Sequence, residues 1–315
     1  MTAPPTFASL PEYISRIDDV GFWRPYVTEI LGRHDLADAG REPAAGFNAT
    51  YPTFVCGDVV VKLFGYSRSW RTGHAAERAA YSLIATDPEI AAPSVVGEGR
   101  LCGDVDAAWP YLITTRVSGV ASWRADLSAD QRRSIAAELG SQARRIHALS
   151  PSGGVATEED WPALNVAGAA QRSSLPPHLV AQVDDYLAQL GPPDRVFVHG
   201  DLVANHIYVE DSRITGIIDW GDAMVTDRHV ELIQIYRDMF ECDKELFGVF
   251  LEASDWPVRE DFPRRALGHA LYRQAMGLAQ HHTVDVFEPI AAAFPLEIIA
   301  TLDQLATELF AFSLS

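Results

Sequence analysis

Two short apolar runs in the second half of the chain each lead to an aspartate, and this pairing constrains the fold more than any other feature. The first run, 196–198, leads through a His-Gly pair to Asp201, and the second, 217–218, leads directly to Asp219. A polar segment at 210–213 between them predicts a hairpin turn. We expect apolar flanks to hold both carboxylates at the edge of a core, where they can place a base beside a metal ion.

Each aspartate has more than one interpretation by itself. Asp201 follows a buried run, so it can be a helix cap or turn residue, or it can accept a proton from an attacking hydroxyl. Asp219 suits a magnesium ion, which prefers hard oxygen ligands. Their spacing of 18 residues makes the pair more specific than either member. His199 is a rival candidate for the general base, but we favour a buried histidine that is hydrogen-bonded to the backbone.

Lysine is rare in this chain, since only Lys62 and Lys244 occur among 25 basic residues. Lys62 lies in an apolar run, where a lysine sits at a sheet edge, snorkels to solvent or pairs in a cleft. Glu77, in the next predicted helix, is a possible partner or part of a solvated face. Protein kinases use a strand lysine and a helix glutamate to hold nucleotide phosphates. The loop 46–50 is small enough for its backbone to approach phosphates, as many hairpin turns are.

The order of predicted elements divides the chain into two lobes. We expect helices at 9–38 and 73–86 and strands at 44–63, 92–96 and 111–115. After a connector at 116–123 the chain becomes mostly helical, with helices predicted at 129–149, 177–190, 228–253, 260–281 and 296–313. We therefore predict an α+β fold with a β-rich N-terminal lobe at 1–115, a helical C-terminal lobe at 116–315, and a cleft between them.

The charge and the cysteines limit the partners and the compartment. A net charge of −18 argues against a nucleic-acid binder and suits a cationic small molecule, although acidity also serves solubility alone. The three cysteines are widely spaced and form no metal or disulfide pattern. Neither a signal peptide nor a long apolar segment is visible. We expect a monomeric protein of the cytoplasm that binds no membrane.

These residues together resemble the aminoglycoside phosphotransferase family, whose fold is related to that of protein kinases. The motifs at 199–202 and 218–220 carry the likeness, which extends over roughly residues 20–255. Within the family, the segments 22–25 and 214–219 are most similar to hygromycin B kinases. The resemblance implies a bilobal kinase-like fold and transfer of the γ-phosphoryl group of ATP, or of GTP, to a hydroxyl of an aminoglycoside such as hygromycin B.

The resemblance also implies the role of each motif residue. Asp201 would be the catalytic aspartate, and Asp219 would hold Mg²⁺. Lys62 would contact the α- and β-phosphates of the nucleotide and would pair with Glu77. The other nucleotide contacts would come from Asn48 in the loop before the lysine strand and from the backbone of Thr115 and Val117 at the hinge.

One position departs from the family pattern. The family usually has an asparagine as second metal ligand five residues after the catalytic aspartate, whereas this chain has His206 there, preceded by Asn205. Histidine is a poorer magnesium ligand than an amide oxygen. Either His206 replaces the asparagine or Asn205 reaches the metal. Macrolide phosphotransferases also carry histidine at this position and are the alternative. A non-catalytic kinase-like binding protein is a further alternative.

Acidic residues are frequent between Asp219 and Glu260. In the family the substrate lies beside this segment, and an acidic wall suits a polycationic aminoglycoside. A macrolide needs a more apolar pocket with one acidic contact. More than half of these acids would be solvated helix faces. We assign the substrate contacts to Asp222, Asp227, Glu231 and Asp238.

Overall fold

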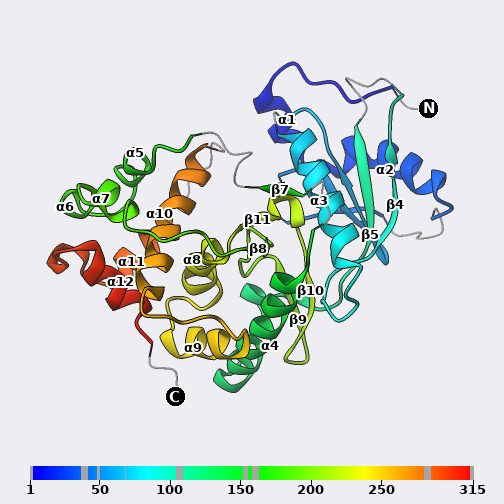
Figure 1. Cartoon of the computed structure of the whole chain (residues 1–315). Helices are drawn as coiled ribbons and strands as arrows, with labels where there is room; N and C mark the ends of the chain where they lie inside the picture. Colours follow the sequence, from blue (N-terminus) through cyan, green and yellow to red (C-terminus); the bar gives the residue numbers. More distant parts are fainter. Residues whose placement is uncertain are drawn as a thin grey trace.

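The computed structural model describes the chain except for residues 1–2, 37–41, 48–49, 68, 104–108, 152–154, 158–162, 280–284 and 313–315. The predicted α+β, kinase-like class is confirmed, with a sheet in the N-terminal part and helices through most of the C-terminal part (Figure 1). The lobe boundary after residue 115 stays a prediction, although a strand ends there. No helix of the described residues is long and apolar enough to cross a membrane.

The N-terminal part is built on one antiparallel sheet. In spatial order its strands are β1 (Ala44–Ala45), β2 (Thr53–Cys56), β3 (Val59–Leu63), β5 (Pro110–Thr115) and β4 (Val95–Arg100). The helices of this part are α1 (Leu10–Arg16), α2 (Val20–Arg33) and α3 (Trp70–Ile84). The first two pack on one face of the sheet around the fully buried Trp23. β4 starts at Val95, whereas the strand was predicted to start at Ala92.

The alternation of side chains along β3 determines where its lysine points. Val59, Val61 and Leu63 are buried in the cluster with α1 and α2. Because successive strand residues face opposite sides of a sheet, Lys62 faces the other side, towards α3. β3 is hydrogen-bonded to β2 on one side and to β5 on the other. The sheet-edge interpretation of this lysine was therefore wrong.

The C-terminal part is arranged around α4 (Ala129–Ala148). This helix begins at a capping box formed by Ser128 and Gln131, which confirms the predicted start. It packs against α9 (Lys244–Ala253), and α10 (Phe262–Ala279) packs against α12 (Leu302–Phe310) (Figure 1). The remaining elements are β6 (Val120–Ala121), β7 (Ala156–Thr157), α5 (Val166–Ala170), α6 (Pro177–Val180), α7 (Val183–Leu187), β8 (Arg195–Val198), β9 (Ile207–Glu210), β10 (Arg213–Ile217), β11 (Met224–Asp227), α8 (Leu232–Gln234) and α11 (Glu288–Ala293).

The helix predicted at 228–253 is interrupted. It consists of a 3₁₀ turn, the short α8, a π-helical turn at Ile235–Met239, and α9. Glu241 and Cys242 separate the last two with positive φ angles of 52° and 62°. Asp243 then caps α9 with its side chain. Similarly, the helix predicted at 177–190 is divided into α6 and α7. Hydrophobic spacing alone does not reveal such breaks, because the apolar pattern continues across them.

Gly140 allows α4 and α9 to approach each other closely. A Cβ atom at this position would lie 2.5 Å from the Phe250 carbonyl oxygen and 2.9 Å from Ala253 Cβ. Gly32 in α2 has nothing within 4 Å of the same position. Alanine substitutions at these two glycines therefore distinguish the effect of helix propensity from the effect of packing.

We predict that Gly140→Ala lowers the free energy of unfolding, although alanine is favoured over glycine in a helix by about 1 kcal/mol. Overpacking against backbone atoms costs roughly 3 kcal/mol and outweighs that gain. Gly32→Ala is the matched control and should stabilise the protein by up to about 1 kcal/mol. Urea denaturation followed by circular dichroism measures both. Equal effects of the two substitutions would contradict the proposed packing.

Candidate active site

The predicted turn at 210–213 joins β9 to β10, which form an antiparallel hairpin. Asp211 and Ser212 have positive φ angles of 48° and 64°, as a tight hairpin turn requires. The run before Asp201, however, forms β8, which pairs with β11 instead of joining this hairpin. The loop 199–206 separates the two. It runs from the end of β8 to the start of β9, so it carries Asp201 to the hairpin that presents Asp219.

The two aspartate segments touch through their backbones. Gly200 has a φ of +84°, and a Cβ atom there would lie 2.2 Å from the Asp222 carbonyl oxygen. Asp219 itself adopts a left-handed conformation, with φ 63° and ψ 64°. A non-glycine residue in this region carries strain, which structures tolerate mainly where geometry serves a site. This contact fixes the separation of the two carboxylates.

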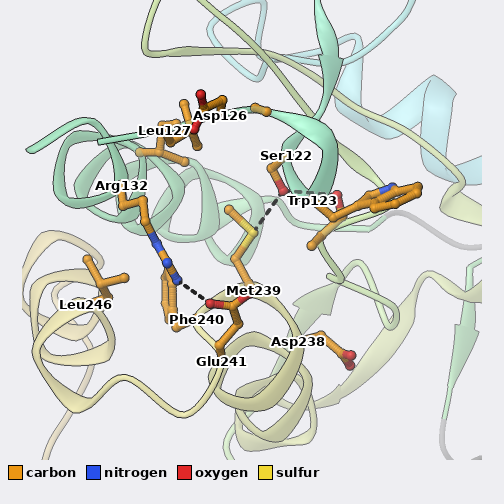
Figure 2. Close-up of a pocket in the computed structure, with 13 residues that line it drawn as sticks. Ser122, Trp123, Asp126, Leu127, Arg132, Asp238, Met239, Phe240, Glu241 and Leu246 are labelled. Carbon is orange, nitrogen blue, oxygen red and sulfur yellow. Dashed lines mark hydrogen bonds and ion pairs between the residues drawn. The ribbon is translucent and has the colours of Figure 1, made fainter. Parts of the chain in front are cut away.

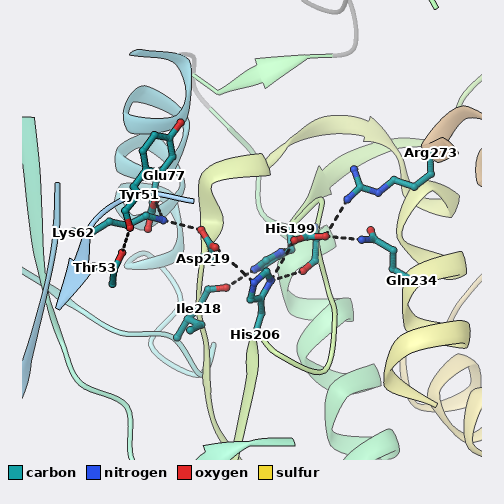
Figure 3. A network of polar contacts seen from close by, with 11 residues as sticks. Tyr51, Thr53, Lys62, Glu77, His199, His206, Ile218, Asp219, Gln234 and Arg273 are labelled. Carbon is teal, nitrogen blue, oxygen red and sulfur yellow. Dashed lines mark hydrogen bonds and ion pairs between the residues drawn. The ribbon is translucent and has the colours of Figure 1, made fainter. Parts of the chain in front are cut away.

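Lys62 joins three elements by ion pairs (Figure 3). Its Nζ donates to Glu77 Oε2 at 2.7 Å and to Asp219 Oδ1 at 2.8 Å. The Glu77 side chain is only 4% exposed and comes from α3, while Asp219 follows β10. The predicted pairing of Lys62 with Glu77 is therefore present, and Asp219 is a second partner of the lysine.

The charges of this ion-pair group depend on one another. Burial raises the pKa of the Glu77 carboxyl, and although Lys62 opposes this shift, the pKa is about 7. Burial alone would lower the pKa of Lys62, but Asp219 and Glu77 raise it above its ordinary value. Burial would raise the pKa of Asp219, but the Lys62 ammonium holds it below its ordinary value. Lys62 and Asp219 are therefore both charged at neutral pH.

Asp201 is oriented by two residues that the sequence did not suggest. Its Oδ1 accepts hydrogen bonds from Gln234 Nε2 at 2.5 Å and from Arg273 Nη2 at 2.9 Å (Figure 3). Gln234 ends α8 and Arg273 lies on α10. Both contacts use the same oxygen, whereas Oδ2 lies 3.4 Å from His206 Nδ1. Arg273 is one of three arginines on α10, so the sequence of this helix did not single it out.

His206 occupies the space between the two aspartates. Its Nδ1 lies 2.9 Å from the Asp201 carbonyl oxygen, and its Nε2 lies 3.6 Å from Asp219 Oδ2. Asn205, in contrast, is exposed. The geometry thus favours His206 over Asn205 as the residue beside the predicted metal position. His199 is fully buried, and its Nε2 lies 2.9 Å from the Ile218 carbonyl oxygen, as expected for a structural histidine. Burial lowers the pKa of His199, which keeps it neutral.

Two of the four predicted substrate carboxylates are fully buried and point into the protein. Glu231 Oε1 accepts from the Gly200 N–H at 3.0 Å, and its Oε2 lies 2.9 Å from His147 Nε2. Asp227 lies 2.6 Å from His229 Nδ1 and also contacts Arg265. Buried, fully partnered carboxylates cannot contact a substrate, so the assignment of Asp227 and Glu231 to the substrate wall was wrong.

The other two predicted substrate residues are partly exposed. Asp238 lies at the end of the π-helical turn, is 34% exposed and pairs with Arg237 at 2.9 Å. Asp222 follows Asp219 in the 3₁₀ turn that contacts α3. Both stay predictions as substrate contacts.

The predicted hinge and the predicted phosphate loop are less completely defined. The N–H of Thr115 donates to the Ser94 carbonyl oxygen at 2.9 Å, so this N–H is already used within the protein. Val117 packs over Gly216, where a Cβ atom would lie 2.3 Å from its Cγ1. Asn48 lies outside the described residues. The nucleotide contacts of Asn48, Thr115 and Val117 therefore stay predictions.

The donor groups near His206 fit a magnesium ion that arrives with a nucleotide. In the described part of the chain, no group of three or more His, Cys, Asp or Glu side chains forms a ready metal site. Magnesium usually retains several waters and binds through one or two carboxylates together with substrate phosphates. Asp219, which is 38% exposed, supplies such a carboxylate, and His206 lies next to it.

Comparison with known proteins identifies the class. A family model described as "Phosphotransferase enzyme family" matches residues 51–294, so the chain belongs to this family. An aminoglycoside 3'-phosphotransferase of Streptomyces fradiae is 31% identical over 181 residues, which cover 50% of this chain and 62% of that protein. A homoserine kinase of Gluconacetobacter diazotrophicus is 30% identical over 143 residues, 41% of each. The chain therefore matches less than two thirds of the length of these curated relatives.

Solved structures share the fold over nearly the whole chain. The GDP complex of a mutant aminoglycoside 2'-phosphotransferase-IIIa has a TM-score of 0.64 at 18% identity and covers 90% of this chain and 98% of its own. A macrolide 2'-phosphotransferase from Brachybacterium faecium has a TM-score of 0.55 at 18% identity, covering 87% and 98%. At these identities the likeness establishes the fold and leaves the substrate open.

We predict that Lys62→Met lowers the free energy of unfolding by about 3 kcal/mol, because it leaves two carboxylates without their cation. The loss should increase as pH rises above 7. The pKa of Glu77 is higher in the folded than in the unfolded protein, so the free energy of unfolding falls as pH rises through the range between these two pKa values. Lys62 lowers the pKa of folded Glu77, so in its absence that pKa is higher and the free energy of unfolding continues to fall at higher pH. Urea denaturation at pH 6, 8 and 9 measures the difference.

Lys244→Met is the matched control for this prediction. Lys244 is the other lysine of the chain, and its Nζ donates to the Glu308 carbonyl oxygen in an exposed position. The Lys244→Met substitution removes the same charge from the protein but leaves no buried carboxylate without its cation. A constant difference between the two variants from pH 6 to 9 would contradict the buried ion-pair group.

Proposed function

We propose that this protein is an antibiotic kinase that transfers the γ-phosphoryl group of ATP or GTP to a hydroxyl of an aminoglycoside. One observation carries the proposal: the Lys62 ion-pair group and Asp201 lie on opposite sides of His206, which contacts both aspartates (Figure 3). Phosphoryl transfer has a loose transition state, so it requires positioned charge more than covalent chemistry. This arrangement supplies a phosphate-binding cation, a metal-binding carboxylate and a proton acceptor together.

The residues divide the work of the reaction. Lys62 would hold the α- and β-phosphates, while Glu77 keeps its side chain directed into the cleft. Asp219, with His206 beside it, would hold Mg²⁺, which supplies neutralising charge to the phosphates when bound. Asp201 would orient the acceptor hydroxyl through Oδ2 and take its proton late in the transfer. Gln234 and Arg273 keep that carboxylate fixed through Oδ1.

Hygromycin B is the first acceptor to test, because the segments 22–25 and 214–219 are similar to those of hygromycin B kinases. A macrolide phosphotransferase is the second candidate, favoured by the histidine at position 206 and by the fold shared with the Brachybacterium faecium enzyme. A panel of aminoglycosides and macrolides, each assayed with ATP and with GTP in the presence of magnesium, separates the two. If neither nucleotide is consumed with any acceptor in the presence of magnesium, the remaining candidate is a non-catalytic binding protein.

We predict that Asp201→Asn lowers kcat by at least about 100-fold, since general-base positioning contributes on this order. The amide keeps the shape of the carboxylate but cannot take a proton. Nucleotide affinity, measured by isothermal titration calorimetry, should stay within a few-fold of the wild-type value. Asp255→Asn, at an exposed position distant in sequence, is the charge-matched control. Turnover near the wild-type rate in Asp201→Asn would remove Asp201 from this role.

His206 is tested by a pair of substitutions. His206→Asn installs the amide that the family usually carries, so we expect it to retain magnesium-dependent transfer. His206→Ala removes the side chain between the two aspartates and should raise the magnesium concentration required for half-maximal rate by about tenfold or more. Initial rates over a magnesium titration measure both. An alanine variant with the wild-type magnesium dependence would exclude His206 from the metal site.

A further inference from the structure

Two exposed aromatic side chains from distant parts of the sequence meet and enclose an arginine. Phe47 and Trp123 have ring centroids 5.2 Å apart and are 56% and 48% exposed. The guanidinium carbon of Arg124 lies 4.4 Å from the centre of the Phe47 ring and 4.6 Å from the centre of the Trp123 ring. We call these three side chains the aromatic clasp. None of them has a role in the chemistry proposed above.

One half of the clasp belongs to the N-terminal sheet, close to the proposed phosphate position. Phe47 directly follows Gly46, whose N–H donates to the Thr53 carbonyl oxygen of β2 at 2.8 Å. Thr53 is in turn the register partner of Lys62 in β3. Neighbouring strands lie about 4.8 Å apart, so Gly46 is roughly 10 Å from the lysine backbone. Phe47 therefore lies in the predicted phosphate loop, near the strand that carries the lysine.

The other half of the clasp is fixed to the loop 199–206. It belongs to a 3₁₀ turn, Ser122–Arg124, which follows β6, and β6 pairs with β9. Ser122 Oγ donates to the Ala204 carbonyl oxygen at 3.0 Å. These residues also line a pocket of about 230 Å³, and Trp123 lies at its edge (Figure 2). The clasp therefore ties the predicted phosphate loop to the loop that begins at the end of β8.

The contacts of the clasp are weak enough to open. A cation over an exposed aromatic ring, or a pair of aromatic rings, contributes a factor of roughly two to ten to an equilibrium constant. Because the clasp is exposed, water can solvate the guanidinium as soon as the rings separate. All three side chains belong to the protein, so the clasp needs no bound group in order to form. It differs in this from the buried ion-pair group of Lys62, whose separation would be costly.

The clasp and the ion-pair group are two separate contacts between the same two parts of the chain. Lys62 pairs with Asp219 in the interior of the cleft, whereas the clasp lies at the exposed surface. A nucleotide whose phosphates reach Lys62 has the ion-pair group on its inner side and the clasp on its outer side. The clasp therefore has to separate before the predicted phosphate loop can move away from the C-terminal part.

We propose that the aromatic clasp is a gate that opens each time a nucleotide enters or leaves the cleft. This inference rests on the proposed kinase function for its ligand and adds a conformational step to it. A ligand that binds only to the open protein associates more slowly, in proportion to the open fraction. The same gate closes over the bound nucleotide, so dissociation slows by a similar factor. The clasp therefore controls the rates of nucleotide exchange and leaves the affinity nearly unchanged.

The test uses the full-length protein and substitutions on both sides of the clasp. Phe47→Ala and Trp123→Leu each remove one ring, and Phe47→Tyr is the conservative variant that keeps the stack. Ile298→Ala is the matched control, because Ile298 is 74% exposed and takes no part in the clasp. Stopped-flow fluorescence with the analogues mant-ADP and mant-GDP, in the presence of magnesium, measures the association and dissociation rate constants. The mant group is excited directly, so the signal does not depend on a tryptophan.

We expect Phe47→Ala and Trp123→Leu each to raise both rate constants by about five- to tenfold, in line with the contacts removed, and to leave Kd within about threefold. The double variant should have no larger effect than either single one, because both break the same contact. Phe47→Tyr and Ile298→Ala should match the wild-type rates. A rise in the dissociation rate constant alone would make Phe47 an ordinary nucleotide contact and overturn the gate. Unchanged rates, or additive effects in the double variant, would overturn it as well.

Failure of the proposed function gives a different result. A protein that binds mant-ADP or mant-GDP but phosphorylates no acceptor contradicts the proposed transfer, while the two rate constants still decide on the gate. Wild-type rates in Phe47→Ala together with retained transfer overturn the gate alone. If the wild-type protein binds neither nucleotide, both the gate and the proposed function are overturned.

Discussion

The ion-pair group of Lys62, Glu77 and Asp219 is the interaction on which the rest of the structure depends. It joins a central strand of the N-terminal sheet, the helix α3 and the end of the β9–β10 hairpin. These three segments come from distant parts of the sequence and share no backbone hydrogen-bond ladder. Because a buried charge without a partner is costly, each of the three side chains requires the other two to be in place. The same requirement that holds the two parts of the chain together also shapes the proposed phosphate-binding position.

Much of this arrangement could be predicted from residues that are unusual where they occur. A lysine in an apolar strand and two aspartates after apolar runs were sufficient to locate the centre of the site. Gln234 and Arg273 were missed because their contacts with Asp201 arise from tertiary packing across 33 and 72 residues. No local pattern encodes such a distance. The breaks in the helix predicted at 228–253 were missed for a related reason, since an uninterrupted apolar pattern conceals a change in helical winding.

The acidic residues show how composition misleads when burial is unknown. Asp227 and Glu231 belong to the same acidic segment as Asp238, yet they serve the interior. Burial alone would raise the pKa of Asp227, but hydrogen bonds from His229 and His269 hold it below the ordinary value. Glu231 fixes the backbone of Gly200, one residue before Asp201. Asp238, which is partly exposed and pairs with Arg237, stays a prediction as a substrate contact.

The close contact of Gly200 with the Asp222 backbone has a consequence for how this protein can change. A side chain there has no room, so almost any substitution would separate Asp201 from Asp219 without touching a ligand. Position 200 is thus closed to variation. New acceptor preferences should therefore arise outside this contact, through exchanges that leave the relative position of the two aspartates intact. A library for altered specificity should keep the loop 199–206 constant.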